Sequence, residues 1–210
     1  GVSSQSDKTD SPMWGGLPVW YGDGSRTKWA RSKTASADWA RWDSTYDNYF
    51  ANLEHRFENG WQAKVNYSRG ERNADSYLLY AYGFPDPVTG QLVLAGPFAP
   101  YAGFNGGSYK TQTEQDDIGL QASGPFKLLG RTHELAFGYS YSNQEFNADT
   151  RGYLSAGNGD FNNWDGSIAP PAWTALTFYE ESELTQQGLY GVARFNVAEP
   201  LKLIVGARVS

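Results

Sequence analysis

Short and long connections alternate along this chain of 210 residues, and that asymmetry restricts its fold more than any other feature. Stretches that alternate apolar and polar residues, the pattern of a β-strand with one apolar face, are joined by short turns near Asn59, Leu128 and Glu199. Long stretches rich in Gly, Pro and Asn separate the hairpins. Because successive antiparallel strands reverse direction, all short turns lie at one end of the predicted sheet and all long loops at the other.

The clearest hairpin covers residues 46–69 and turns at Glu58, Asn59 and Gly60. On both sides of the turn, apolar residues such as Leu53 and Val65 alternate with polar ones, which predicts two paired strands. The same period of two predicts further strands over residues 109–126, 134–141, 180–197 and 201–209. The fold class is therefore all-β, with about six antiparallel strands.

Three long loops are predicted, over residues 5–45, 83–108 and 147–176. Within the first, the spacing of Trp39 and Trp42 predicts a single helical turn with Ser36 as its cap. Compact domains rarely contain structureless loops of this length unless the loops are functional. Transmembrane β-barrels combine them with short periplasmic turns and aromatic residues that flank an apolar band. We therefore expect a segment of an antiparallel up-and-down transmembrane β-barrel.

Charge and motifs exclude several classes of function. The net charge is -6 and no block of Lys or Arg occurs, so we expect no nucleic-acid partner. The two histidines, His55 and His133, are isolated at short turns, and the chain contains no cysteine, so we expect no metal site. No nucleotide-binding or nucleophile motif is present, and we expect no enzyme.

Tryptophans point to the long loops as the functional end. Seven of the eight fall in the first and third predicted loops. Loops commonly carry function, so these rings suggest a ligand surface. The alternative is that they only pack the loops against one another, and the sequence leaves both interpretations open.

Four segments resemble a known family: residues 10–18 (DSPMWGGLP), 49–57 (YFANLEHRF), 114–126 (EQDDIGLQASGPF) and 200–208 (PLKLIVGAR). Together they are similar to the barrel of TonB-dependent ferric-siderophore receptors, above all the ferripyoverdine and ferric-coprogen branch. The resemblance implies about six strands of a barrel of about 22. The family's plug and TonB box have no counterpart in the sequence, so residues 1–210 are expected to be an internal part of one β-barrel domain.

What this resemblance implies is a receptor in the bacterial outer membrane that binds an iron chelate in an aromatic extracellular vestibule and imports it when TonB pulls on the plug. The candidate siderophore-binding residues are Trp14, Trp20, Tyr21, Trp39 and Trp42. No resident cofactor is expected, because the iron arrives already ligated. The implied partners are a ferric siderophore, outer-membrane lipid and, through the missing N-terminal part, TonB.

Two other classes remain open at this stage. A secreted β-sandwich or β-propeller that binds or hydrolyses glycans also has strands with one apolar face, although its connections are not sorted by length. A passive porin shares the barrel but has no need of the loop tryptophans.

Overall fold

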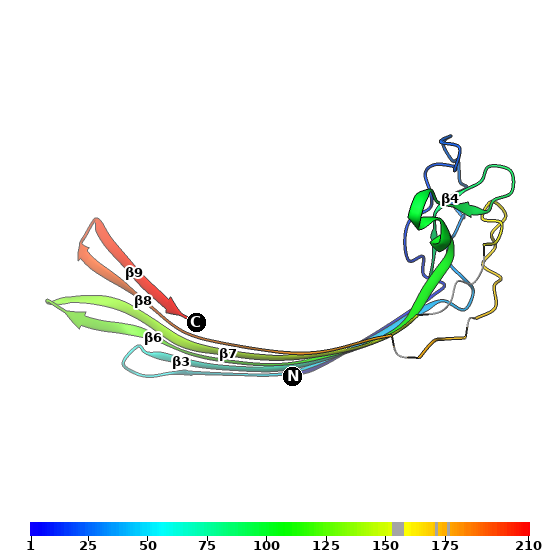
Figure 1. Ribbon diagram of the computed structural model, residues 1–210. Helices are drawn as coiled ribbons and strands as arrows, with labels where there is room; N and C mark the ends of the chain where they lie inside the picture. Colours follow the sequence, from blue (N-terminus) through cyan, green and yellow to red (C-terminus); the bar gives the residue numbers. More distant parts are fainter. Residues whose placement is uncertain (153–157, 171, 176) are drawn as a thin grey trace.

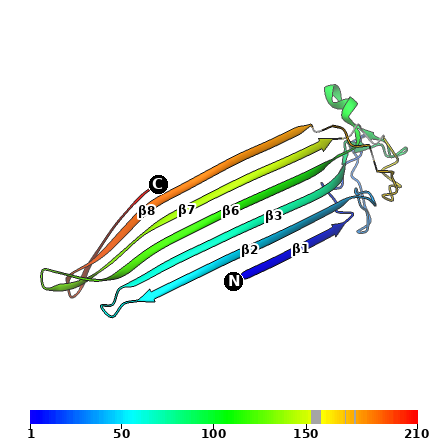
Figure 2. The ribbon, with the colours of Figure 1, turned by 90° about the horizontal axis from the view of Figure 1, so that it is seen from below.

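The computed structural model describes residues 1–152, 158–170, 172–175 and 177–210. Within these residues seven antiparallel strands form one curved, open sheet, in which each strand pairs with the next along the chain (Figures 1 and 2). In sheet order they are β1 (Val2–Asp10), β2 (Arg41–Arg56), β3 (Gln62–Tyr82), β6 (Gly103–Leu128), β7 (Arg131–Gly152), β8 (Phe178–Ala198) and β9 (Leu201–Val209).

The second loop contains a small two-stranded sheet of β4 (Phe84–Pro85) and β5 (Leu92–Val93), and a 3₁₀ helix, η1 (Gly96–Tyr101). The all-β prediction is confirmed. In the described part of the chain, no helix is long and apolar enough to cross a membrane.

Cross-strand pairing separates two faces of the sheet. One transverse row joins Leu53, Val65, Leu120, Tyr139, Leu189 and Val209. We call the side that carries this row the apolar face. The adjacent row, on the opposite or polar face, joins Asn52, Asn66, Gly119, Ser140 and Gly188. Because side chains alternate across a strand, the face of every strand residue follows from these rows.

All three short turns lie at one end of the sheet and all long connections at the other, as the sequence predicts (Figure 2). In the first turn the Phe57 N–H donates to the Trp61 carbonyl (2.8 Å), and Gly60 has a φ of 85°. In the second turn Leu129 and Gly130 have φ values of 50° and 72°. Two consecutive positive φ angles give the turn whose twist matches that of the flanking strands.

The first loop is shorter than predicted, because both of its ends belong to strands. It covers residues 11–40 instead of 5–45. Residues 2–10 are mostly polar and lack a hydrophobic period, and they form β1 by main-chain pairing with β2. The sheet therefore has seven strands, one more than predicted.

The helical turn predicted around Trp39 and Trp42 is wrong, because β2 begins at Arg41 and includes Trp42 in the sheet.

The second loop covers residues 83–102, since β6 begins at Gly103. β7 likewise continues to Gly152, into the loop predicted over 147–176, part of which lies outside the described residues. These extensions contain Gly and Asn and show no hydrophobic period, so only the ladder of hydrogen bonds marks them as strands.

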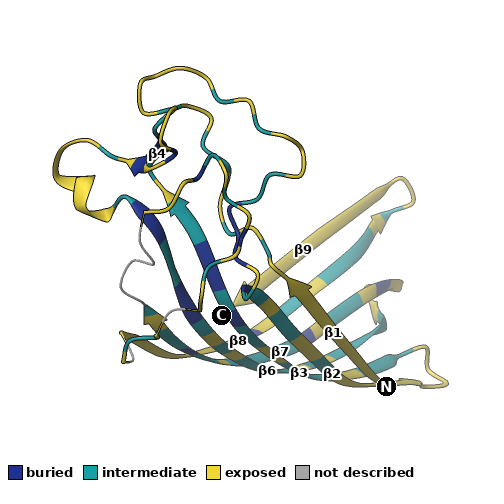
Figure 3. Cartoon of the chain, turned by 90° about the vertical axis from the view of Figure 1, so that its right-hand side faces the viewer, coloured by how far each residue is buried: buried dark blue, intermediate teal, exposed yellow. Residues whose placement is uncertain are grey.

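The long loops share one small core at their end of the sheet (Figure 3). Its buried residues come from all three loops and from the ends of β3 and β6: Ala35, Ala37, Leu79, Leu92, Phe104 and Phe161. The fully buried Phe104 ring stacks on Trp164, with 3.9 Å between ring centroids. Stacked aromatic pairs add stability beyond the area they bury.

Lys33 ties the first loop to the third across this core. Its Nζ donates to the carbonyls of Asn162 (3.1 Å) and Trp164 (3.2 Å). The same ammonium lies 5.5 Å from the Trp29 ring centroid and 5.1 Å from that of Phe161. Burial lowers the pKa of the Lys33 ammonium, and nearby carboxylates act in the opposite direction. The loops thus form a connected unit, held by apolar packing and by one cation.

Candidate ligand-binding site

An aromatic cluster of Trp14, Tyr80 and Tyr109 lies on the polar face, at the loop end of the sheet. The Trp14 ring meets Tyr80 edge-on with 5.2 Å between centroids, and meets Tyr109 in the same manner at 5.3 Å. Tyr82, the next polar-face residue of β3, lies 6.3 Å from Tyr80. Aromatic side chains of one loop and two strands therefore converge on one place.

The loop segment that carries Trp14 is fixed by local contacts. The buried Ser36 hydroxyl donates to the Pro12 carbonyl at 2.8 Å. Immediately after Trp14, Gly15 takes a φ of 120°, a conformation that a residue with a Cβ rarely adopts. An added Cβ there would lie 3.7 Å from the Tyr80 Cβ. The Trp-Gly-Gly sequence thus lets the chain turn close to the sheet while the indole contacts both tyrosines.

The cluster suits a ligand with flat or conjugated groups. The three rings are half-buried, and each combines apolar ring surface with an O–H or N–H group. Among the described residues, no three carboxylate or imidazole side chains are grouped so as to hold a metal ion. The chemistry that the cluster offers is stacking and hydrogen bonding.

Hydrogen-bonding side chains line the polar face between the cluster and the short turns. A shallow cavity of about 310 Å³ lies there, lined by Tyr46, Asn48, Ser68, Gly70, Arg72, Thr113, Gln115, Asp117 and Gln144. Gln115 Nε2 donates to Asp117 Oδ1 at 3.1 Å, and the Ser68 hydroxyl donates to the same carboxylate at 3.4 Å. A polar molecule that passed the aromatic cluster would therefore meet donors and acceptors next.

The five residues predicted from the sequence do not form a single cluster. Trp42 lies on the polar face in the same transverse row as Tyr109 and is 42% exposed, so it extends the site around Trp14. Trp39 packs against the loop core. Tyr21 packs edge-on against Trp29, and Trp20 is exposed in the loop. The ligand-binding role of each of these residues stays a prediction.

Sequence reasoning did not propose Tyr80 or Tyr109 as binding residues. Two signals were available to find them. Both lie where a strand meets a long loop, and both fall on the polar parity of their strand, where an aromatic ring has no lipid or core to cover.

Comparison with known proteins identifies the family. A family model described as "TonB dependent receptor-like, beta-barrel" matches residues 3–210. The chain belongs to the TonB-dependent receptor family. These receptors are outer-membrane proteins, and in such barrels the apolar face contacts lipid while the polar face lines the interior. The aromatic cluster therefore faces the barrel interior at the extracellular end.

Two relatives and one solved structure show the range of the match. The ferripyoverdine receptor of Pseudomonas aeruginosa is 32% identical over 215 residues, covering 100% of this chain and 25% of the receptor. The ferric-pyoverdine BN7/BN8 receptor of Pseudomonas putida is 32% identical over 217 residues, covering 100% of this chain and 26% of the receptor. The crystal structure of the Pseudomonas aeruginosa receptor bound to ferripyoverdine superimposes with a TM-score of 0.85 at 30% identity, covering 99% of this chain and 27% of the other.

The chain thus spans about a quarter of the length of the curated relatives it matches. Its sheet is an open arc of the TonB-dependent receptor barrel, with unpaired edges at β1 and β9 in the described residues. The resemblance predicted from the four sequence segments is confirmed.

Proposed function

We propose that this chain forms part of the barrel of an outer-membrane receptor that takes up a ferric siderophore of the pyoverdine class with energy from TonB. The observation that carries the proposal is the cluster of Trp14, Tyr80 and Tyr109. It lies on the interior face at the extracellular end, in a chain that is similar over its whole length to ferripyoverdine receptors.

In this proposal the receptor needs neither a resident cofactor nor a catalytic residue. The iron arrives inside its chelate, so the protein supplies stacking surface and hydrogen bonds around the organic ligand. Uptake moves the chelate without breaking a covalent bond. The contact with TonB is assigned to a plug segment outside residues 1–210. A glycan-binding β-sandwich is not favoured, because the described strands form one continuous curved arc and the barrel family matches.

The test is the retention of radiolabelled ferripyoverdines by outer membranes that contain the receptor, across a panel of pyoverdines. Trp14→Ala removes the ring that contacts both tyrosines and should weaken binding about 10- to 100-fold, the effect of losing a central aromatic contact. Trp61→Ala is the matched control, because Trp61 lies beside a short turn at the opposite end. If Trp14→Ala and Trp61→Ala bind every pyoverdine with equal affinity, the assignment of the binding site to the Trp14 cluster is refuted. If the parent protein binds none of the pyoverdines, the proposed class of ligand is refuted.

A further inference from the structure

Asn-Gly pairs occur three times in the chain: Asn59-Gly60, Asn105-Gly106 and Asn158-Gly159. An asparagine before glycine can lose its side-chain amide, because the backbone nitrogen of the next residue attacks the amide carbon and closes a succinimide ring. Glycine favours this attack, since it has no Cβ to obstruct the approach and its backbone adopts many conformations. Whether a pair reacts in the folded protein therefore depends on the contacts that hold it.

The first pair forms the tip of the exposed turn between β2 and β3. The Asn59 Oδ1 accepts a hydrogen bond from the Trp61 N–H at 3.1 Å, whereas its Nδ2 has no acceptor among the described residues. The Gly60 N–H donates to the Phe57 carbonyl at 3.0 Å, and this bond must break before the Gly60 nitrogen can turn toward the side chain. The tip of an exposed turn opens more readily than a strand inside a ladder.

The contacts of Asn59 also suit the chemistry of deamidation. Attack joins the Gly60 nitrogen to Cγ of Asn59, and a carbonyl electron pair moves onto Oδ1, where the Trp61 N–H stabilises the developing negative charge. When the carbonyl re-forms, the Cγ–Nδ2 bond breaks, and Nδ2 leaves as ammonia with the proton that the Gly60 nitrogen gives up. Water then opens the ring at either carbonyl and leaves an aspartate or an isoaspartate. One water is consumed and one ammonia is released, so the reaction needs no oxidant.

The second pair is held at the end of a strand. Asn105 lies in β6, opposite Tyr80 of β3. Its Nδ2 donates to the carbonyls of Tyr101 at 3.1 Å and Gly103 at 3.2 Å. The leaving amide is therefore bound at two points, and the main chain cannot rotate toward it without opening the ladder of β3 and β6.

The third pair is clamped between two loops. Asn158 is exposed, but its side-chain amide binds the backbone of Leu92 at both ends. Its Oδ1 accepts from the Leu92 N–H at 2.6 Å, and its Nδ2 donates to the Leu92 carbonyl at 2.7 Å. These bonds imitate those of a neighbouring strand and join the third loop to the second. The clamp thus protects the pair whose reaction would set a carboxylate against the Leu92 carbonyl.

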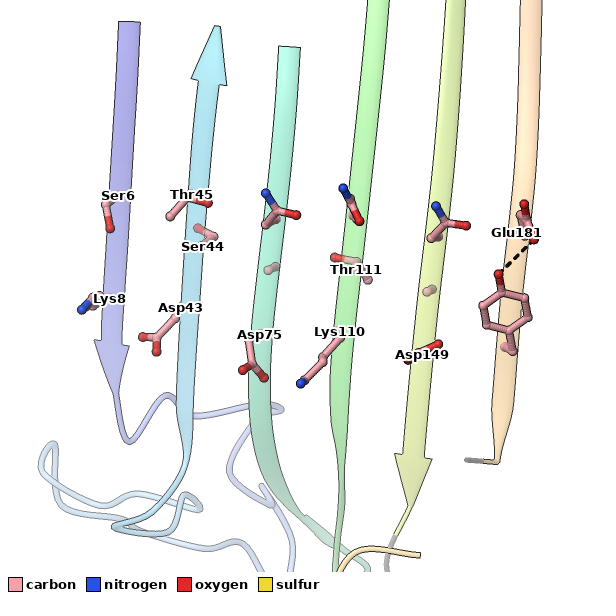
Figure 4. Close-up of a pocket in the computed structure, with 16 residues that line it drawn as sticks. Ser6, Lys8, Asp43, Ser44, Thr45, Asp75, Lys110, Thr111, Asp149 and Glu181 are labelled. Atoms are coloured by element: carbon pink, nitrogen blue, oxygen red, sulfur yellow. Dashed lines mark hydrogen bonds between the residues drawn. The ribbon is translucent and has the colours of Figure 1, made fainter. Parts of the chain in front are cut away.

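Asparagines in the middle of the sheet provide a further comparison. Asn73 and Asn147 line a groove on the apolar face, among the side chains that Figure 4 shows. Their side-chain amides have no hydrogen-bond partner in the described part of the chain. However, each is followed by alanine, whose Cβ obstructs the attacking nitrogen, and each is paired on both sides. A free amide alone is therefore not sufficient, because reaction also requires the glycine and the turn.

We propose that Asn59 is a site of spontaneous deamidation in the folded receptor, and that their contacts protect the other two Asn-Gly pairs. Both products place a new negative charge beside Glu58, and isoaspartate also adds one methylene to the main chain of the turn. The proposal does not depend on the siderophore site, which lies at the opposite end of the sheet.

The experiment incubates the full receptor in outer membranes in isotopically labelled water at mildly alkaline pH, and follows uptake of heavy oxygen at each asparagine by peptide mass spectrometry. Asn59 should take up label at least about tenfold faster than Asn105 or Asn158, the factor expected from two further hydrogen bonds on the slower pairs. Asn73 and Asn147 should take up none. The matched control is the same receptor unfolded in urea, in which the three Asn-Gly pairs should react at similar rates.

A variant tests the protection directly. Phe161→Ala removes a buried ring from the core that holds the loops, so it should speed the reaction of Asn158 and leave that of Asn59 unchanged. An unchanged rate at Asn158 in this variant would contradict protection by the clamp.

Two other results would overturn the proposal. The first is label uptake at Asn59 that is no faster than at Asn105 and Asn158 in the folded receptor. The second is the same ratio of the three rates in the folded receptor and in urea, which would assign the difference to the flanking sequence and not to the structure.

Discussion

Replacement of Phe161 by Ala should release the loops without unfolding the sheet. The Phe161 side chain is fully buried, and its ring centroid lies 5.4 Å from that of Trp29 and 6.2 Å from that of Phe104. Its backbone N–H also donates to the Gly90 carbonyl at 2.9 Å, which joins the third loop to the second. Removing a buried Phe side chain costs about 3–5 kcal/mol. None of these contacts is part of the strand pairing, so the lost free energy lowers the stability of the closed loops and leaves that of the sheet unchanged.

By this estimate the population of open loops rises about 140- to 3,700-fold, at about 1.4 kcal/mol per factor of ten. The assay is limited proteolysis of the folded receptor in outer membranes, following cleavage within residues 83–102. Phe98→Ala is the matched control, because Phe98 is 57% exposed on η1 and its loss should change stability by about 0.5 kcal/mol at most. Cleavage of Phe161→Ala at the rate of the control would refute the idea that one core holds the loops.

Three further predictions concern other parts of the chain. Gly138→Val should reduce barrel assembly, seen as less heat-modifiable receptor on gels, because an added Cβ would lie 2.5 Å from a carbonyl of the neighbouring strand; Gly119→Ala, with its nearest contact at 3.4 Å, should assemble normally. His133→Phe should cost about 1–3 kcal/mol in urea unfolding, because the buried ring bonds two backbone groups at 3.0 Å each; an unchanged midpoint would contradict this role. The side-chain hydrogen bond from Asn163 is the main cause that lowers the pKa of Asp160 below 3.8. The ionised Asp160 therefore stabilises the third loop above that pH, and this stabilisation is lost as the pH falls through the lowered pKa. Protease cleavage of the third loop should therefore rise in acid for the parent and rise less for Asp160→Asn.

The fold was predictable from the sequence where burial against lipid imposes a period. The row through Leu53, Val65 and Leu120 follows directly from alternating residues, and so do the short turns. β1 escaped prediction because, after Val2, it consists of Ser, Gln, Asp, Lys and Thr, which carry no hydrophobic signal. The helical turn predicted at Trp39 and Trp42 does not form, because the main chain from Arg41 onward pairs with β3. These tertiary hydrogen bonds outweigh the local preference that the spacing of the two tryptophans indicates.

The candidate site was only partly predictable, because it depends on how a loop returns to the sheet. The MWGG motif pointed to Trp14, but the two tyrosines that it contacts are more than sixty residues away in the sequence. Trp39 shows the opposite case: an aromatic loop residue whose ring packs against the loop core. Composition does not distinguish these two uses of tryptophan, since only tertiary contacts separate a ring that faces the barrel interior from one that holds loops together.

The Lys33 contacts also determine how the loops of this barrel segment can be exchanged. Lys33 of the first loop hydrogen-bonds the carbonyls of Asn162 and Trp164 in the third loop. Phe161 of the third loop also packs on Trp29 of the first. The two loops therefore cannot be exchanged independently of one another. A single loop transplanted from a related receptor would lose the packing and hydrogen-bond partners that it has in the other loop. An exchange that moves the three loops of this chain together preserves their shared core, so the three loops are the unit to exchange in engineering.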